Sequence, residues 1–219
     1  TYLNYAESFE PVGGSDRNGE KHHLATSDQW ELGVKYSSLD QRSLLALVAF
    51  EINKKNALTR DPSGGPYDLV QAGETRSRGV EIESRYIYSE SLMWTFNYTW
   101  LDVEVTKDNT GLEGKTPVWI ADNTANLWVQ YDLLEGLLAG IQLGAGVRYV
   151  GETEMDELNT DVVPDYTVFD LVISRDFGAA NVRVSASNIT NEDSYSCYDS
   201  NNCWFGAERS IELAAVYEF

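Results

Sequence analysis

The chain is poor in basic side chains, with 16 lysines and arginines against 35 acidic residues and a formal net charge of −19. Proteins that bind nucleic acid need a basic surface to neutralise phosphates, and this composition does not provide one. We therefore expect no nucleic-acid partner.

Histidine is nearly absent, which weighs against a hydrolytic enzyme. Hydrolysis needs a nucleophile or water activated by a base, usually a histidine oriented by a carboxylate. The chain has only His22 and His23, adjacent to each other near Glu20, and it has neither a G-x-S-x-G nor an H-E-x-x-H motif. We interpret the two histidines as surface residues of a loop and expect no catalytic residues.

Long apolar runs are also missing. The longest, Leu44 to Phe50, has the length of a strand, so no segment can cross a bilayer as a helix. With 42% hydrophobic residues the chain is nevertheless not a disordered sequence. If it lies in a membrane, it must do so as a closed barrel, because lipid offers no partners for unpaired backbone groups.

What the sequence does contain is alternation of apolar and polar residues with period two, which predicts about ten strands bounded by turn signals. The last stretch, Ser210 to Phe219, ends on an aromatic residue, as the closing strand of an outer-membrane barrel does. We expect each apolar set to face lipid. The sets are Trp30, Leu32, Val34 and Tyr36; Leu44, Ala46, Val48, Phe50 and Ile52; Val80, Ile82, Tyr86 and Tyr88; Trp94, Phe96, Tyr98 and Trp100; Ala125, Leu127, Val129 and Tyr131; Ile141, Leu143, Ala145, Val147 and Tyr149; Phe169, Leu171 and Ile173; Val182, Val184 and Ala186; and Ile211, Leu213, Ala215, Tyr217 and Phe219.

The connections between these segments alternate strictly between short and long. An antiparallel up-and-down transmembrane barrel has this asymmetry, with tight turns on the periplasmic side and long loops outside. A soluble sandwich would show the same alternation of apolar and polar residues along its strands, but it would not be expected to alternate short and long connections. The predicted short links are 37–42, 89–91, 132–140 and 176–181, and the long ones are 10–28, 59–71, 107–117, 151–164 and 191–204.

The predicted outer loops are polar, and the one after Gly151 is acidic. They are either solvated surface or a vestibule suited to a neutral or cationic ligand. The two cysteines, Cys197 and Cys203, lie in the last long loop and predict a disulfide that pins it, since two thiols without a nearby histidine make only half a metal site.

The charged residues Glu81, Glu83 and Arg85 alternate with Val80 and Ile82, so we expect them to face the barrel lumen. On the lipid face an arginine or lysine would cost about 2 to 4 kcal/mol at the membrane midplane. We interpret these charges as part of a structural ion-pair network on the lumen wall.

Several motifs, in order along nearly the whole chain, resemble the C-terminal half of a TonB-dependent outer-membrane siderophore receptor, closest to its ferrichrome or hydroxamate branch. G-E-x-R-S-R-G-V-E and the cysteine loop make the resemblance specific. The motifs are Y-A-E-S-F-E-P-V-G-G (5–14), Q-A-G-E-T-R-S-R-G-V-E-I-E (71–83), G-A-G-V-R-Y-V-G (144–151), S-N-I-T-N-E (187–192) and C-W-F-G-A-E-R (203–209).

The resemblance implies a barrel of about 22 strands with a separate N-terminal plug in its lumen. Residues 1–219 would then form the C-terminal part of that barrel, with the plug and the N-terminal strands outside this chain. The chain begins at Thr1 within a predicted strand and shows no signal peptide, which fits that expectation.

The implied function is uptake of a ferric siderophore, with energy from the TonB complex delivered through the plug, and with outer-membrane lipid and lipopolysaccharide around the barrel. No cofactor is expected, and iron enters only as the transported chelate. Candidate ligand-binding residues are the loop aromatics Tyr198, Trp204 and Phe205, although Trp204 and Phe205 fit an interfacial girdle equally well. A passive pore and a small ten-stranded hydrolase of the outer membrane remain as alternatives.

Overall fold

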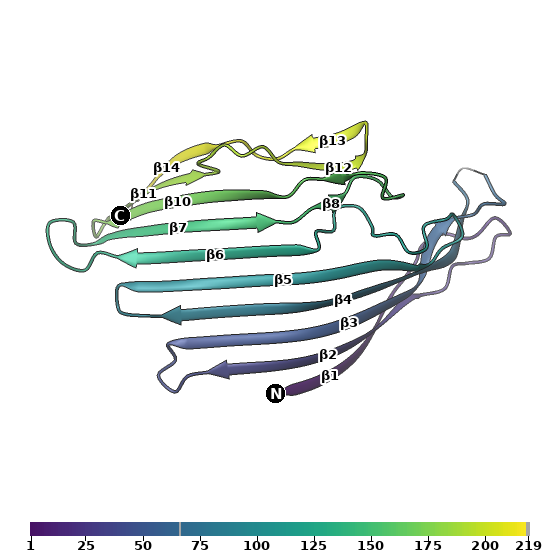
Figure 1. The fold of residues 1–219 in the computed structure, drawn as a ribbon, viewed down its shortest axis with the longest axis horizontal. Helices are drawn as coiled ribbons and strands as arrows, with labels where there is room; N and C mark the ends of the chain where they lie inside the picture. Colours follow the sequence, from purple (N-terminus) through teal and green to yellow (C-terminus); the bar gives the residue numbers. More distant parts are fainter. Residues whose placement is uncertain (66, 218–219) are drawn as a thin grey trace.

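The computed structural model describes residues 1–65 and 67–217. Ten strands form one antiparallel sheet in the order β1-β2-β3-β4-β5-β6-β7-β10-β11-β14 (Figure 1). The described part of the chain has no helix long and apolar enough to cross a membrane. The strands are β1 (Tyr2–Glu10), β2 (Ala25–Ser37), β3 (Ser43–Arg60), β4 (Leu69–Ile87), β5 (Leu92–Lys107), β6 (Asn123–Asp132), β7 (Ile141–Val150), β10 (Tyr166–Asp176), β11 (Ala180–Ser187) and β14 (Ser210–Tyr217).

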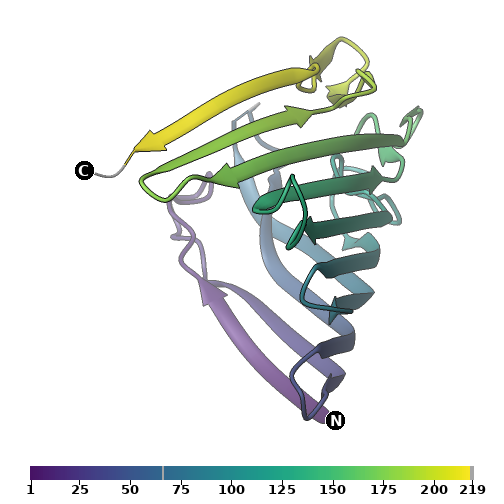
Figure 2. The same cartoon turned by 90° about the vertical axis from the view of Figure 1, so that its left-hand side faces the viewer.

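Two small hairpins lie outside this sheet, within the longer connections. One joins β8 (Thr153–Glu154) to β9 (Val162–Val163), and the other joins β12 (Tyr195–Asp199) to β13 (Asn202–Phe205). The sheet bends into an open trough whose edges are β1 and β14 (Figure 2). The meander confirms the predicted up-and-down order, and the ten predicted segments correspond to the ten strands. The predicted aromatic end at Phe219 lies outside the described residues.

The connections fall alternately at the two ends of the sheet (Figure 1), and four of the five at the long-loop end are longer than every connection at the other end. The exception is 61–68, which has eight residues, as many as 133–140. β3 and β4 are 18 and 19 residues long, and they extend by two and three residues into the predicted connection 59–71. The connection between them is correspondingly shorter than expected. The short turns are 38–42, 88–91, 133–140 and 177–179, and the long loops are 11–24, 61–68, 108–122, 151–165 and 188–209.

One face of the sheet is apolar across all its strands. Directly opposed residues of neighbouring strands share a face, so a continuous apolar row crosses the wall through Val34, Leu47, Ile82, Tyr98 and Ala125. From Trp94 to Trp100 the apolar band spans about 20 Å along β5, at roughly 3.4 Å per residue.

This apolar face is not the inside of a sandwich. Leu213 is 71% exposed, and the described residues form no second large sheet that packs on the first. Exposing an apolar face of this size to water is unfavourable, so the face must contact another apolar medium. In the part of the chain that the structure describes, the sheet has no second layer to supply one, which excludes a soluble sandwich and leaves lipid as that medium.

The prediction for the apolar set of β3 is wrong. Val48 lies opposite Gly33 and Glu81, and Ala46 lies opposite Lys35 and Glu83, so Leu44, Ala46, Val48, Phe50 and Ile52 share the polar face. The apolar face of this strand is formed instead by Leu45, Leu47 and Ala49. Residues 44–50 are apolar on both faces, so the period of two identified the strand but left its facing undecided.

Toward the long loops the apolar face becomes charged. Glu51, Arg78 and Asp102 are direct cross-strand neighbours on this face. The Arg78 guanidinium is 2.7 Å from the Asp102 carboxylate, and Arg76 is 2.7 Å from Glu104. Arg76 and Arg78 therefore lie on the opposite face from Glu81 and Glu83. We call the band formed by Asp28, Lys55, Arg76, Arg78, Asp102 and Glu104 the charged collar.

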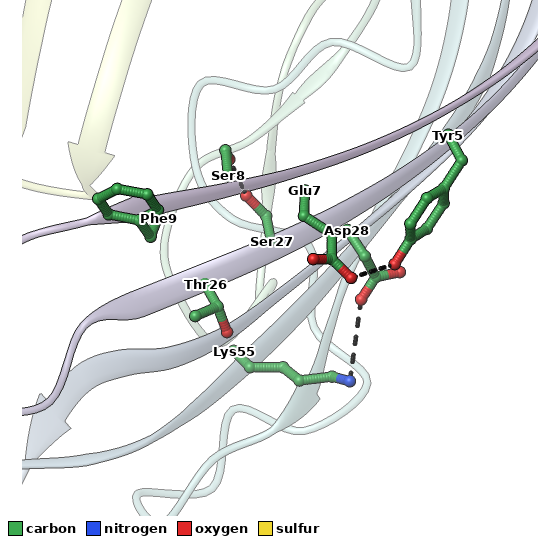
Figure 3. Close-up of a pocket in the computed structure, with 8 residues that line it drawn as sticks. All are labelled: Tyr5, Glu7, Ser8, Phe9, Thr26, Ser27, Asp28 and Lys55. Atoms are coloured by element: carbon green, nitrogen blue, oxygen red, sulfur yellow. Dashed lines mark hydrogen bonds and ion pairs between the residues drawn. The ribbon is translucent and has the colours of Figure 1, made fainter.

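The collar continues to the edge of the sheet at β1, where it borders a shallow depression of about 620 Å³ (Figure 3). Lys55 Nζ lies 3.8 Å from Asp28 Oδ1, and the Tyr5 hydroxyl donates to Glu7 at 2.6 Å. The Tyr5 ring also packs on Trp30, with ring centroids 4.8 Å apart. This corner thus marks the transition from the apolar band to polar surroundings at the long-loop end.

Candidate functional site

The longest connection, 188–209, carries the β12–β13 hairpin. Cys197 and Cys203 are directly opposed in it and form the predicted disulfide. Cys197 is buried, whereas Cys203 is exposed, so the hairpin is anchored against protein on the side of Cys197. The disulfide fixes the hairpin on which the predicted ligand-binding aromatics are carried.

The three predicted aromatics separate into two groups, because neighbouring residues of a strand point to opposite faces. Trp204 lies opposite Ser196, whereas Phe205 lies opposite Tyr195 on the side of the disulfide. Phe205 contacts Tyr195 edge to face at 6.0 Å between centroids and is 83% exposed. Trp204 instead meets a residue from another loop.

That residue is Trp119, in the 108–122 loop. Its ring centroid lies 5.9 Å from that of Tyr198 and 6.4 Å from that of Trp204. Trp119 has a φ of 67°, a left-handed conformation that costs a bulky residue about 1 to 3 kcal/mol. Sequence reasoning missed Trp119; the available signal was a lone tryptophan in a long polar loop.

A third loop, 151–165, joins the same surface. The Thr116 N–H donates to Asn159 Oδ1 at 2.8 Å, and Asn159 Nδ2 donates to the Thr116 carbonyl at 2.8 Å. The Tyr198 hydroxyl donates to Glu157 Oε1 at 3.2 Å. Three loops thus present one set of side chains, and we call Trp119, Glu157, Tyr198 and Trp204 the rim cluster.

The charge around the rim cluster is negative. The 151–165 loop contains six acidic residues and no lysine, arginine or histidine. The Glu157 carboxylate raises the pKa of Tyr198, because its charge repels a phenolate and because it accepts a hydrogen bond from the Tyr198 hydroxyl. The backbone N–H of Asn201 lowers the pKa of Asp199. The site therefore favours the protonated phenol of Tyr198 and the ionised carboxylate of Asp199.

The turn next to the rim cluster is organised by Asp156. Its carboxylate accepts the Thr160 hydroxyl as well as the backbone N–H groups of Leu158, at 2.9 Å, and Thr160, at 3.2 Å. The Thr160 hydroxyl is the largest cause of a lowered pKa for Asp156. Because these bonds are made to the charged form, the turn is strongest when Asp156 is ionised.

This arrangement predicts a pH dependence. The folded pKa of Asp156 is below the ordinary value of 3.8, so its contribution is complete above that value and is lost as the pH falls through the folded pKa. In Thr160→Val the pKa of Asp156 should rise toward 3.8. A carboxyl-carbon NMR titration of labelled aspartate in the folded receptor measures both values; equal pKa values would contradict this assignment.

The foot of the 188–209 loop is organised by Asn188, which is 4% exposed. Its side-chain amide donates to the carbonyls of Glu192, at 2.9 Å, and Ala207, at 3.1 Å, and its Oδ1 accepts the Glu192 N–H at 2.8 Å. Its backbone N–H donates to Asp170, which also pairs with Arg148. The buried amide thus joins the two ends of the loop, and the backbone N–H of the same residue joins them to β10.

The predicted lumen residues Glu81, Glu83 and Arg85 lie on the face opposite the apolar one. Glu81 and Glu83 line a depression of about 320 Å³ on that face, together with Glu31 and the apolar residues of β3. Within the described residues neither Glu81 nor Glu83 forms an ion pair, whereas Arg148 and Asp170 pair on the same face at 3.3 Å. Arg85 Nε contacts Met93 Sδ at 3.4 Å.

The polar face also carries an aromatic residue that the sequence analysis passed over. Trp128 lies opposite Thr95 and Gly146, and its indole covers Gly144 and Gly146 so closely that a Cβ on Gly144 would come within 2.4 Å of the ring. The glycines therefore provide space for a flat indole on this wall. The sequence signal for this contact was the pair Gly144 and Gly146, two residues apart in a predicted strand that follows one containing Trp128.

In the 11–24 loop, His23 makes two hydrogen bonds through its backbone, both to the Gln71 side chain. Gln71 Oε1 accepts the His23 N–H at 2.6 Å, and Gln71 Nε2 donates to the His23 carbonyl at 2.8 Å. Across residues 1–65 and 67–217, no group of three or more histidine, cysteine or acidic side chains is arranged to hold a metal.

A single-layered meander with one apolar face, alternating short turns and long loops, and a polar opposite face defines part of the wall of an outer-membrane β-barrel. The family model described as TonB dependent receptor-like, beta-barrel, matches residues 1–191. The chain belongs to this family of outer-membrane receptors.

The relatives agree with this assignment. The chain is 34% identical to the ferrioxamine B receptor of Salmonella typhimurium (strain SL1344) and 34% identical to the ferrichrome outer membrane transporter/phage receptor of Escherichia coli (strain K12). All of this chain is covered in both cases, but only 32% and 30% of those proteins. The chain therefore spans about a third of the length of these relatives.

A solved structure gives the same result. The ferric preacinetobactin receptor BauA of Acinetobacter baumannii superposes with a TM-score of 0.79 at 28% identity, over 97% of this chain and 33% of that one. The fold prediction, a ten-stranded part of a larger receptor barrel in the outer membrane, is confirmed.

Proposed function

We propose that this chain is the C-terminal part of the barrel of a receptor that imports a ferric siderophore of the hydroxamate type. The observation that carries the proposal is full-length similarity of this chain to receptors for ferrioxamine B and ferrichrome. The rim cluster supports it, because aromatic faces and polar groups from several loops are suited to holding a bulky chelate. The remaining strands and a plug would be supplied by parts of the receptor outside this chain.

In this proposal the long loops lie outside the cell and capture the chelate. The polar face lines the lumen, where Glu81, Glu83 and Arg85 meet groups of the plug. The TonB complex acts on the plug, and energy from the inner membrane rearranges it so that the chelate passes. The charged collar lies at the level of the lipopolysaccharide headgroups, beyond the apolar band.

We propose no covalent chemistry for this chain. Its relatives are transport receptors, and its two histidines lie in a loop rather than with the rim cluster. Iron takes part only as the metal of the transported chelate.

Uptake of ⁵⁵Fe tests this function in a strain whose only route for ferric trihydroxamates is the intact receptor. Deletion of the gene should abolish uptake of the ⁵⁵Fe-trihydroxamate, and re-expression should restore it only when TonB is active. A matched ferric tricatecholate serves as the control substrate. Uptake that persists without TonB would instead support a passive pore.

The disulfide provides a second test. In the chain-entropy model, closing a loop of this size contributes about 2 kcal/mol to the stability of the hairpin. The intact receptor with Cys197→Ser and Cys203→Ser should therefore fold but bind a ferric trihydroxamate several-fold more weakly, because the Tyr198 and Trp204 rings lose their fixed support. Tryptophan fluorescence quenching measures the affinity; unchanged affinity would argue against a ligand-binding role for this loop.

A further inference from the structure

The rim cluster combines aromatic faces with negative charge that lacks a basic partner. Trp119, Tyr198 and Trp204 come from two loops, and Glu157 comes from a third. Within the described residues neither Glu157, Asp156 nor Asp199 forms an ion pair, although eight such pairs occur elsewhere in the structure. The negative charge at this position is therefore available to a ligand.

The side chains of the rim cluster are held in place by contacts on both sides. The disulfide fixes one side, the reciprocal bonds between Thr116 and Asn159 fix the other, and Trp119 is held in a left-handed backbone conformation between them. Strain of this kind is kept where surrounding contacts hold a side chain in place. The three rings remain substantially exposed despite these contacts, so their faces are open to solvent.

Aromatic faces and carboxylates together favour one ligand group. The negative faces of tryptophan and tyrosine attract organic cations, and an adjacent carboxylate adds a charge-assisted hydrogen bond to an ammonium N–H. The same surroundings repel anionic groups. Resting on the proposed function, we infer that the rim cluster selects ferric chelates that carry a primary alkylammonium group, with the ammonium held between Glu157 and the Trp119 and Tyr198 rings.

The test compares two chelates that differ only in this group. One is the ferric complex of a linear trihydroxamate with a free terminal amine, and the other is the same complex with the amine acetylated. The intact receptor should bind the amine form about tenfold more tightly, which corresponds to about 1.4 kcal/mol. The ratio should fall as salt is raised, because the charges at this site are exposed.

Two variants should remove the preference. Glu157→Gln keeps an acceptor for Tyr198 but loses the charge, and Trp119→Leu loses the ring. Each should lower the ratio of the two affinities to below about threefold, because the amine form loses more affinity than the acetylated form.

Matched controls separate the site from its surroundings. Glu152→Gln removes the same charge from the same loop, and Phe205→Leu removes an exposed aromatic from the same hairpin, away from the cluster. Both should keep the full preference. Heat-modifiable migration of each variant confirms that it is folded.

The possible results distinguish this inference from the proposed function. If both chelates bind wild-type receptor equally, or if Glu152→Gln reduces the ratio as much as Glu157→Gln, ammonium selection by the rim cluster is wrong while hydroxamate import stands. If neither chelate binds, the proposed function itself is wrong, and the inference fails with it.

Discussion

Leu47→Arg is expected to prevent stable insertion of the barrel, whereas Val48→Arg, one residue further on, should be tolerated. Leu47 lies in the apolar row between Val34 and Ile82, near the middle of the band. A lipid-facing arginine there should cost about 2 to 4 kcal/mol. Val48 lies on the opposite face beside Glu81, where a guanidinium finds a carboxylate and an aqueous or protein environment.

The measurement is the folded fraction of the intact receptor in lipid vesicles, followed by heat-modifiable gel migration and by urea unfolding. Leu47→Ala and Val48→Ala control for the loss of the native side chains. Equal destabilisation by the two arginine substitutions would show that β3 does not have the register found here. A larger cost at Val48 would mean that its two faces are reversed.

Asn188→Ala is expected to disorder the 188–209 loop and to weaken chelate binding at least tenfold. The substitution leaves the carbonyls of Glu192 and Ala207 without their buried donor, at about 1 to 3 kcal/mol. It also places alanine in a left-handed conformation, since Asn188 has a φ of 51°, which adds roughly 1 to 2 kcal/mol. The loop that carries the disulfide hairpin would then lose the side-chain bonds that hold its two ends together, while the backbone N–H of residue 188 still donates to Asp170.

Asn191 provides the matched control. It has nearly the same backbone φ, 54°, but it is exposed, and its side chain accepts one hydrogen bond among the described residues, from the Arg209 N–H. Asn191→Ala should therefore show the backbone cost together with the loss of one exposed hydrogen bond. Asn188→Gly should relieve the strain but not replace the amide. Hydrogen exchange of the 188–209 backbone in folded receptor measures the effect; protection in Asn188→Ala equal to that in Asn191→Ala would contradict the role of the buried amide.

The S-N-I-T-N-E motif shows how a sequence signal differs from its physical cause. In the sequence it contributed to a family resemblance and nothing more. The structure shows that its first asparagine is a buried connector and its second an exposed turn residue. Both residues are asparagines in turns, so the sequence does not distinguish them. Their different burial is the reason that we expect a large effect from Asn188→Ala and a small one from Asn191→Ala.

The candidate site was predictable in part. Tyr198, Trp204 and the disulfide were found because they are adjacent in sequence and lie in one long loop. Trp119 and Glu157 were not, since they come from loops about 80 and 40 residues away and reach Tyr198 only through tertiary contacts. Phe205 was grouped with Trp204 by proximity, but a strand directs neighbouring side chains to opposite faces.

The sequence by itself determined the strand count, the meander and the alternation of turns and loops, because period-two patterning and turn residues are local signals. Only the tertiary structure decided which face of β3 meets lipid and which residues of separate loops meet at the rim. The reason is that the facing of a strand with two apolar sides is set by hydrogen-bond register with its neighbours. Contacts between loops likewise depend on how the whole wall curves, which no single segment encodes.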